Sequence, residues 1–290
     1  MTPTVYIVVG PTAVGKTKYA IDLAQQLQTE IISADARQCY QELNIGVARP
    51  SNEELAQVKH HFIASHSIQE TVNAGTFEAY ALKKSAELLA AFGSVVMVGG
   101  TGLYIKAFVE GMDQIPAIDP AIRSQIQEDV SLKGMDWLQA QVQAKDPAYW
   151  ASADQGEQQN TQRLSRALEV MTGTGQSILS FQNQTKQTRP FNIQKIGLEM
   201  TREQLYDRIN QRVHQMDHMG LEEEVRSLRP QFHLNALQTV GYQEWLPYFD
   251  GQQTKEAVIQ AIQQNTRHYA KRQMTWFKKD PEIKWSQASH

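Results

Sequence analysis

The strongest constraint on the fold of this chain is a glycine-rich stretch, Gly10 to Thr17, with the spacing G-x-x-x-x-G-K-T. It follows a β-type apolar run at residues 5–9 and precedes residues with the apolar spacing of a helix. Glycines let backbone N–H groups turn inward, and the helix N-terminus adds partial positive charge, so this order favours a phosphate chain over a coincidental turn. The Lys16 amine would reach terminal phosphate oxygens, and the Thr17 hydroxyl would bind Mg²⁺. The predicted phosphate-binding residues are Gly10, Pro11, Thr12, Ala13, Val14, Gly15, Lys16 and Thr17.

Size and composition limit the number of domains and the cellular location that this chain can have. A length of 290 residues predicts one large or two modest domains, and the formal net charge of −3 decides nothing about nucleic acid. The single cysteine, Cys39, excludes an internal disulfide and fits a reducing cytosol. The first strand begins within a few residues of the N-terminus, which leaves no room for a signal peptide, and no apolar run approaches the roughly 18 residues of a membrane span. We therefore expect a cytoplasmic protein with no membrane contact, and a monomer.

The residues after the glycine-rich loop predict a βαβ unit. Tyr19, Ala20, Leu23, Ala24 and Leu27 recur at helical spacing and predict one buried helix face. An apolar run at residues 30–35 then ends in a carboxylate, and parallel sheets place ligands beyond the carboxyl ends of their strands.

Asp35 is therefore expected to face the same crevice as Lys16, as a general base or a metal contact. The alternative is a loop aspartate that caps a turn. The polar, irregular residues 36–50 are typical of a binding loop.

A second buried strand is predicted at residues 94–98, after an amphipathic helix at 76–92, and it runs into Gly99-Gly100-Thr101-Gly102. The comparable strand of a typical ATPase ends in acids that hold Mg²⁺ and activate water. This chain has the phosphate loop without those acids. Thr101 is expected to hydrogen-bond a ligand, and a simple turn threonine is the alternative. The pair His60-His61 has no further ligands at metal-binding spacing, which favours ordinary loop histidines.

The composition changes between residues 117 and 190, where strand-forming runs disappear. Helices are predicted at 120–132 and 135–145, separated by Gly134, and at 161–171. The predicted fold class is therefore α/β: a P-loop parallel-sheet core, residues 1–116 and 191–290, with a helical insertion domain, residues 117–190.

The C-terminal part adds a predicted strand at 194–198 and a helix from residue 203, on which Arg208 and Arg212 lie four residues apart. One of these arginines is expected to bind a diphosphate. Residues 266–279 carry five basic residues and no acid, interleaved with Tyr269, Trp276 and Phe277. This favours RNA binding. The alternative is a helix with a solvated basic face and an aromatic edge in the core.

Taken together, these segments resemble one family, the tRNA dimethylallyltransferases. The matching blocks are colinear from the first strand to about Trp285 and comprise 10–17, 33–38 with Tyr40, 44–46, 98–106, 162–164 with 166–169, 220–225, 240–244, and 269–273 with 275–277. The phosphate loop is shared with many nucleotide enzymes, but the whole set is highly specific. Departures from the family pattern are Cys39, Val47, Arg49, the lack of an acid after the pair His60-His61 within residues 60–64, and Thr161.

The resemblance implies transfer of a dimethylallyl group from dimethylallyl diphosphate to N6 of the adenosine 3′ of the anticodon, in tRNAs that read codons beginning with U. It implies Mg²⁺ as cofactor and the tRNA anticodon loop as partner. The implied catalytic residues are Asp35 as general base, Thr101, Lys16, and Arg212 on the diphosphate, with Arg208 as its substitute. The implied tRNA contacts are Asp35, Ala36, Arg37, Gln38, Thr101, Arg123, Gln159, Asn160, Thr161, Gln162 and Arg163.

Three other readings stay open at this point. A P-loop small-molecule kinase would use Lys16 and Thr17 on ATP-Mg²⁺, but it has little need of a long insertion or a basic C-terminal region. A prenyltransferase acting on free adenine nucleotide would share the core without needing residues 266–279. A non-catalytic RNA-binding protein is disfavoured by the intact loop together with Asp35.

Overall fold

The computed structural model describes residues 2–113, 115–182 and 186–288, which form two compact units. The first, the core, comprises Met1–Gly111 with Thr188–His290, and the second, the insertion, comprises Met112–Gln187. Both junctions lie a few residues before the expected ones, at 117 and 190. The class is α/β, as predicted.

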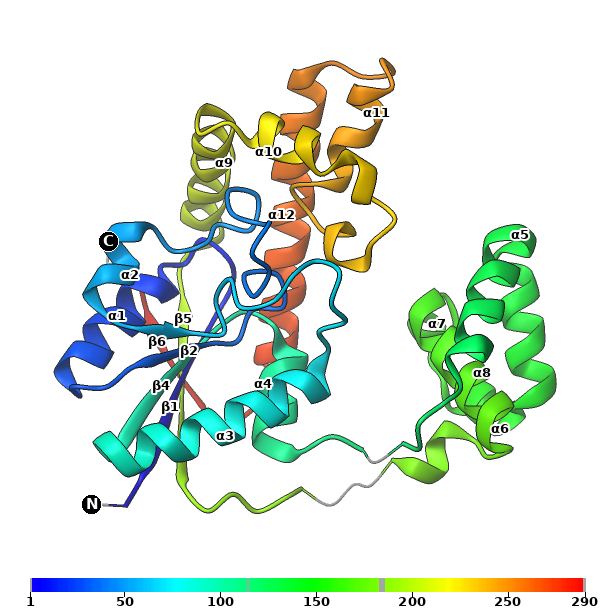
Figure 1. The fold of residues 1–290 in the computed structure, drawn as a ribbon, viewed down its shortest axis with the longest axis horizontal. Coiled ribbons are helices and arrows are strands. Elements are labelled where there is room, and N and C mark those ends of the chain that lie inside the picture. Colours follow the sequence, from blue (N-terminus) through cyan, green and yellow to red (C-terminus); the bar gives the residue numbers. More distant parts are fainter. Residues whose placement is uncertain (1, 114, 183–185, 289–290) are drawn as a thin grey trace. The chain divides into compact units, whose positions relative to one another are not determined.

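A six-stranded sheet in the order β3-β2-β4-β1-β5-β6, with every neighbouring pair parallel, forms the centre of the core (Figure 1). The strands are β1 (Thr4–Val9), β2 (Ile31–Ser33), β3 (His60–His61), β4 (Ser94–Val98), β5 (Asn192–Glu199) and β6 (Ile283–Gln287). Four of them match predicted strands. The prediction of loop histidines at 60–61 is wrong, because both residues pair with β2 as an edge strand.

Alternation along β1 explains how the sheet is covered on both faces. Val5, Ile7 and Val9 pack into a cluster with residues of α3 (Ala74–Phe92) and α4 (Gly102–Glu110). Val8 points to the opposite face, where it packs with α1 (Lys16–Gln26). The buried stripe of α1 consists of Ala20, Ile21 and Ala24, so the expected burial of Tyr19, which is 37% exposed, is wrong.

The second half of the core is mostly helical. Its elements are α9 (Arg202–His218), α10 (Leu221–Ser227), α11 (Leu246–Phe249), α12 (Lys255–Phe277) and the short 3₁₀ turns 229–231, 235–237 and 243–245; α2 (Asn52–Gln57) lies in the first half. Helix α9 buries Leu205, Ile209, Val213 and Met216, as predicted, and packs against α12 (Figure 1). The basic segment 266–279 is therefore mainly part of a packed helix, and β6 follows it into the sheet.

The insertion has a small hydrophobic core of its own, which includes Leu138, Val142 and Leu164. Its helices are α5 (Pro120–Lys145), α6 (Pro147–Ser152), α7 (Gln155–Gln158) and α8 (Thr161–Thr174), followed by a 3₁₀ turn at Ile178–Phe181. At Gly134 the backbone of α5 is non-helical, with φ 78°, so two helices meet there as predicted. No helix in the described part of the chain is long and apolar enough to cross a membrane.

Candidate functional site

The glycine-rich loop joins β1 to α1 in the predicted order. Gly10 has φ 147°, and a Cβ atom there would lie 2.5 Å from the Leu198 carbonyl oxygen, so only glycine fits. Helix α1 begins after Gly15, and no side chain caps its N-terminus. Its first backbone N–H groups are therefore directed at the space above the loop, where an anion would be stabilised.

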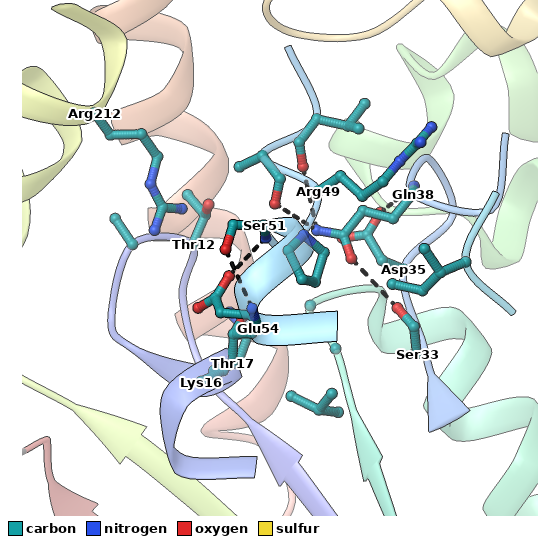
Figure 2. A pocket seen from close by; sticks show the side chains of 18 of the residues that line it. Thr12, Lys16, Thr17, Ser33, Asp35, Gln38, Arg49, Ser51, Glu54 and Arg212 are labelled. Carbon is teal, nitrogen blue, oxygen red and sulfur yellow. Dashed lines mark hydrogen bonds between the residues drawn. The ribbon is translucent and has the colours of Figure 1, made fainter. Parts of the chain in front are cut away.

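Five cationic side chains line the cavity above this loop, which has a volume of about 580 Å³. They are Lys16 of the loop, Arg208 and Arg212 from α9, and also Lys18 and Arg49. The Lys16 Nζ donates to the Pro11 carbonyl at 2.7 Å. Figure 2 shows the Arg212 side chain extending from α9 toward the loop at Thr12. Both arginines considered as diphosphate ligands thus line the same cavity.

The five cationic side chains outnumber the three carboxylates that line this cavity, those of Asp35, Glu53 and Glu54. Burial and the charge of Arg212 lower the pKa of Lys16 to about 7, against a smaller opposite effect of Asp35. Burial and the charge of Arg208 lower the pKa of Arg212 as well, against a smaller opposite effect of Glu54. Cations that disfavour one another in a desolvated space form a binding site for an anion.

Asp35 lies just beyond the end of β2, on the wall of the same cavity. Its Oδ1 accepts hydrogen bonds from the backbone N–H groups of Arg37, at 2.8 Å, and Gln38, at 3.2 Å. The carboxylate therefore caps a turn and also faces the cavity, and its action as a general base or metal contact stays a prediction. These two bonds fix the orientation of the carboxylate while Oδ2 has no hydrogen bond among the described residues.

Thr101 precedes α4 and connects the end of β4 to the loop of Asp35. Its Oγ1 accepts a hydrogen bond from the Ala36 N–H at 3.0 Å, and its own N–H donates to the Ala34 carbonyl at 3.3 Å. The Thr101 hydroxyl also interacts with Tyr269, whose pKa is raised to about 12 by burial and by the charge of Asp35. Thr101 is thus part of the frame that positions residues 34–36.

The binding loop predicted at 36–50 is irregular, and internal hydrogen bonds hold it in place. The Gln38 amide donates to the carbonyls of Val47, at 3.2 Å, and Ala48, at 3.0 Å (Figure 2). The guanidinium of Arg49, one of the departures from the family pattern, donates to three carbonyls of the loop, those of residues 40, 41 and 43. Glu224 accepts from the N–H groups of residues 45 and 46.

The remaining predicted tRNA contacts, Arg123 and residues 159–163, belong to the insertion. The Arg123 guanidinium pairs with Glu169 at 3.2 Å and is half exposed. Asn160 caps α8 by accepting from the Arg163 N–H at 3.1 Å, and the Arg163 side chain pairs with Glu157 at 2.7 Å. Each of these groups has a structural partner within the insertion, and their contact with RNA stays a prediction.

Sequence analysis missed a residue at the back of the phosphate loop. The side chain of Gln273, on α12, bonds to the Thr12 N–H at 2.8 Å and to the Gly100 carbonyl at 3.0 Å. It is 6% exposed and lies on the same buried helix face as Ala270 and Phe277. A polar residue at helical spacing on an apolar stripe is the signal that could have identified it.

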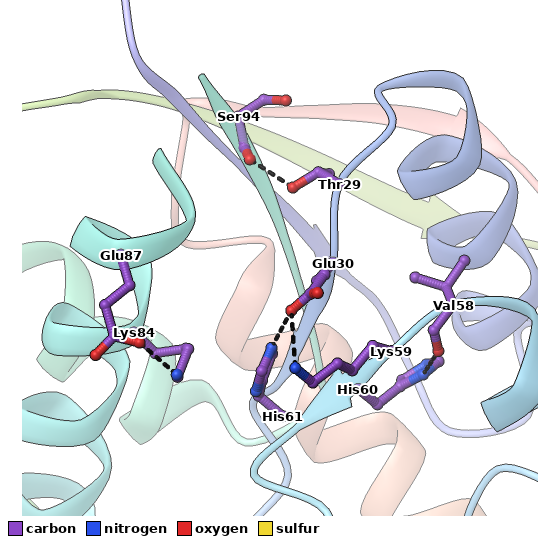
Figure 3. A network of polar contacts seen from close by, with 9 residues as sticks. All are labelled: Thr29, Glu30, Val58, Lys59, His60, His61, Lys84, Glu87 and Ser94. Carbon is purple, nitrogen blue, oxygen red and sulfur yellow. Dashed lines mark hydrogen bonds and ion pairs between the residues drawn. The ribbon is translucent and has the colours of Figure 1, made fainter. Parts of the chain in front are cut away.

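The two histidines of β3 do not form a metal centre. His61 Nε2 lies 2.5 Å from the Glu30 carboxylate, and the Lys59 amine is 3.8 Å from the same oxygen (Figure 3). Among the described residues, no group of three or more His, Cys, Asp or Glu side chains could hold a metal ion. The Thr17 hydroxyl lines the large cavity, and one hydroxyl suits Mg²⁺, which takes most of its ligands from substrate phosphates and water.

A second, smaller cavity of about 110 Å³ adjoins the first. The two share the residues at their junction: Thr12, Asp35, Val47, Ala48, Arg212, Met216 and Tyr269. The first cavity has the phosphate loop, whereas the second is lined away from the junction by Arg37, Gly46 and the segment 239–241. Asp35 therefore stands between an anion site and a second compartment, an arrangement suited to group transfer between two substrates.

Comparison with known proteins identifies similar chains. The family model described as IPP transferase matches residues 38–280. A tRNA dimethylallyltransferase of Christiangramia forsetii is 49% identical over 278 residues, which cover 96% of this chain and 91% of that protein. The solved structure of a tRNA isopentenylpyrophosphate transferase from Bacillus halodurans has a TM-score of 0.71 at 34% identity, covering 99% of this chain and 90% of that one. A eukaryotic dimethylallyltransferase acting on tRNA shares the fold, with a TM-score of 0.81 at 22% identity, over 99% and 74% of the two chains.

Proposed function

The chain belongs to the IPP transferase family and is a prenyltransferase, and we propose that it moves a dimethylallyl group from dimethylallyl diphosphate to N6 of an adenosine in tRNA. The acceptor proposed from the family resemblance is the adenosine 3′ of the anticodon, in tRNAs reading codons that begin with U. Action in the cytoplasm, as a monomer, remains the expectation from sequence.

One observation carries this proposal: Lys16, Arg208 and Arg212 line one cavity at a phosphate loop that has no acid pair at the end of the neighbouring strand β4. An enzyme that hydrolyses a nucleotide needs such acids to activate water. A transferase whose leaving group is diphosphate needs the cations and is best served by keeping water inactive.

In the proposed reaction the adenosine N6 attacks C1 of the dimethylallyl chain, and the C1–O bond to the diphosphate breaks. The electron pair of that bond leaves with the diphosphate, where Lys16 and Arg212 stabilise the added negative charge. The proton lost from N6 passes to Asp35, whose orientation is fixed by its bonds to Arg37 and Gln38. Thr101 holds the Ala36 end of the same turn.

The two adjoining cavities support a place for each substrate. We assign the diphosphate to the cavity with Lys16 and Thr17, and the acceptor base to the smaller one. Their shared wall includes Asp35, so the base would stand where donor carbon and acceptor amine meet. A base that enters a compartment of this size has to leave its stack in the RNA.

Thr17 is the residue that would hold Mg²⁺, together with the oxygens of the diphosphate. When bound, the ion neutralises part of the charge on the leaving group.

For the RNA we propose the insertion residues named above and the exposed face of α12. On that face an open groove is lined by His268, Lys271, Arg272, Thr275, Trp276 and Lys279. Of the five basic residues predicted to bind RNA, Arg267 lies over the ring of Tyr206 and Lys278 pairs with Glu199. Lys271, Arg272 and Lys279 are exposed and suited to phosphates, although Arg272 also lies over the ring of Tyr269.

The decisive experiment incubates the pure protein with Mg²⁺, labelled dimethylallyl diphosphate and unmodified tRNA. We expect label on N6 of the adenosine 3′ of the anticodon. ATP consumption with a small acceptor and no label in tRNA would favour the kinase interpretation. Label on free adenine nucleotide alone would favour a prenyltransferase that acts on the free nucleotide.

The role of Asp35 is tested by Asp35→Ala and Asp35→Asn. Both should lower transfer by about 10²- to 10⁴-fold, because the proton acceptor is lost. Asn keeps an oxygen for the two backbone N–H groups, so tRNA binding should persist in that variant. Transfer near the wild-type rate in both variants would refute the base assignment.

The proposed RNA contact of the α12 groove is tested by substitution. Deleting residues 266–290 is unsuitable, because it would remove β6 and the buried Phe277 and so unfold the core. Lys271→Gln with Lys279→Gln should weaken tRNA binding and lessen its salt dependence. Lys83→Gln with Lys284→Gln, which removes two exposed charges outside that groove, is the matched control.

A further inference from the structure

The Gln273 side chain is one of the few buried polar groups of the core, and both ends of its amide are used. Oε1 accepts a hydrogen bond from the Thr12 N–H at 2.8 Å, and Nε2 donates to the Gly100 carbonyl at 3.0 Å. A Cβ atom on Gly100 would lie 2.1 Å from that Nε2, so the absence of a side chain at Gly100 is what admits the amide.

The two partners require a primary amide in one orientation. Thr12 offers a donor and Gly100 an acceptor, so the bridging group must accept on one side and donate on the other. An ionised glutamate only accepts, and a methionine of similar length does neither. Since the site is buried, a lost bond would leave a backbone polar group without a partner.

The bridge joins the two halves of the proposed reaction site. Thr12 belongs to the loop assigned to the diphosphate. Gly100 is followed by Thr101, whose hydroxyl holds the N–H of Ala36, and Ala36 follows Asp35. A run of covalent and hydrogen bonds thus leads from the phosphate loop through Gln273 to the carboxylate. The other connection between them runs through the parallel strands β1, β4 and β2.

We propose that Gln273 is a positioning residue that sets the separation between the leaving group and the Asp35 base, and so the rate of the transfer step. This inference rests on the proposed function. It assigns Gln273 no contact with either substrate, and the amide acts through Thr12 and Gly100. Reacting groups displaced by as little as an ångström lose rate with little change in binding, which gives the proposal its signature.

The test compares wild type, Gln273→Met, Gln273→Glu and the control Gln264→Met, an exposed glutamine on the same helix. The measurements are the single-turnover transfer rate with saturating substrates, the Kd values for tRNA and for magnesium pyrophosphate, and Tm. Gln273→Met should lower the transfer rate by about 10- to 100-fold while both Kd values change little. Gln264→Met should behave like wild type.

The pH profile of Gln273→Glu separates positioning from general support of the fold. A protonated carboxyl group accepts at one oxygen and donates at the other, as the amide does, whereas the ionised form cannot donate to Gly100. Its rate relative to wild type should therefore recover as pH falls, and that of Gln273→Met should not. If Gln273→Met does not fold, this profile alone decides the question.

The inference would be overturned if the wild-type protein transfers the group and Gln273→Met does so at the same rate. So would a Gln273→Glu ratio that is flat with pH, or rate losses matched by equal losses of pyrophosphate and tRNA affinity. Failure of the wild-type protein to label tRNA would instead refute the proposed function, so the two failures are distinct.

Discussion

Two lysines of the core are withdrawn from solvent and differ in what surrounds their amines. Lys195, on β5, is 7% exposed and donates to Asp280 at 2.6 Å and to Glu282 at 2.7 Å. Burial works against its charge, but these bonds outweigh it and raise the pKa of Lys195. Lys16 is partly buried and makes no ion pair within the described part of the chain. Its pKa falls to about 7.

The difference separates an ion pair that holds the fold together from a site prepared for a ligand. The acids around Lys195 lie next to β6, so that pairing helps to fasten the last strand to β5. The partner of Lys16 is the neutral carbonyl of Pro11, with Arg212 as a nearby like charge. Such a cation costs stability until an anion binds, so a buried amine without an ion-pair partner marks the site.

The largest effect is expected when the two lysines are exchanged for methionine. Lys16→Met should lower transfer by about 10³-fold through lost stabilisation of the leaving group. It should leave Tm unchanged or higher, because it removes a desolvated charge. Lys195→Met should keep the wild-type rate but lower the free energy of unfolding by about 1–3 kcal/mol, since two partly exposed acids lose their partner. Single-turnover rates and urea unfolding measure both.

Two outcomes would contradict this assignment of roles to Lys16 and Lys195. A stable, active Lys16→Met protein would mean that the loop amine does not contact the substrate. A Lys195→Met protein with wild-type stability would mean that the acids near β6 contribute nothing to the fold.

The next effect concerns the two arginines of α9 that line the cavity with Lys16. Arg212 lines both cavities, whereas Arg208 lines only the larger, where its Nη2 is 3.7 Å from the position of a Cβ on Gly15. Arg212→Ala should lower kcat/KM for dimethylallyl diphosphate by about 10²-fold, and Arg208→Ala by about 10-fold. Arg202→Ala, exposed on the same helix, is the control. The reverse order would make Arg208 the main diphosphate ligand.

The phosphate loop, four of the strands and the amphipathic face of α9 could be predicted because their signals are contiguous in the sequence. The strand, the glycine-rich loop and the helix all lie within residues 4–26, and each has its own recognisable spacing of apolar residues or glycines. The order of the strands could not be predicted, nor could the two edge strands. β6 carries Lys284 and Trp285, and its place depends on pairing with β5, some ninety residues earlier in the chain.

The candidate site divides in the same way. Lys16 and Asp35 were predicted from a loop and a strand end. The helix face predicted one of Arg208 and Arg212, and the family resemblance favoured Arg212; the structure brings all four side chains to one cavity. Gln273 was not predicted, because its partner Thr12 lies 261 positions away. Tyr19 was misplaced for a simpler reason: alanines fill the buried stripe of α1, and the ring turns outward.

The smallest effect, and the most direct probe of the Lys16 charge, is a pH dependence of donor binding without tRNA. The pKa of Lys16 is about 7 in the free protein, and a bound diphosphate should raise it. Above pH 7 binding must then take up a proton, so the Kd for dimethylallyl diphosphate should rise as pH increases, approaching about 10-fold per pH unit. Below pH 7 the amine is already charged, and this contribution to the pH dependence disappears.

Calorimetry between pH 6 and pH 9, in buffers with different ionisation enthalpies, measures the Kd and counts the protons taken up. Lys16→Arg supplies the control, since a guanidinium stays charged throughout this range and should give a flat profile at its own affinity. Lys195 is already charged and paired, so donor binding should not change its protonation. Lys195→Met should therefore show the wild-type dependence of the Kd on pH. A wild-type Kd that is constant from pH 7 to pH 9, with no proton uptake, would show that Lys16 is charged before the donor arrives. Lys16 and Lys195 would then differ only in the groups that surround their amines. Binding of the donor would not be needed to protonate Lys16.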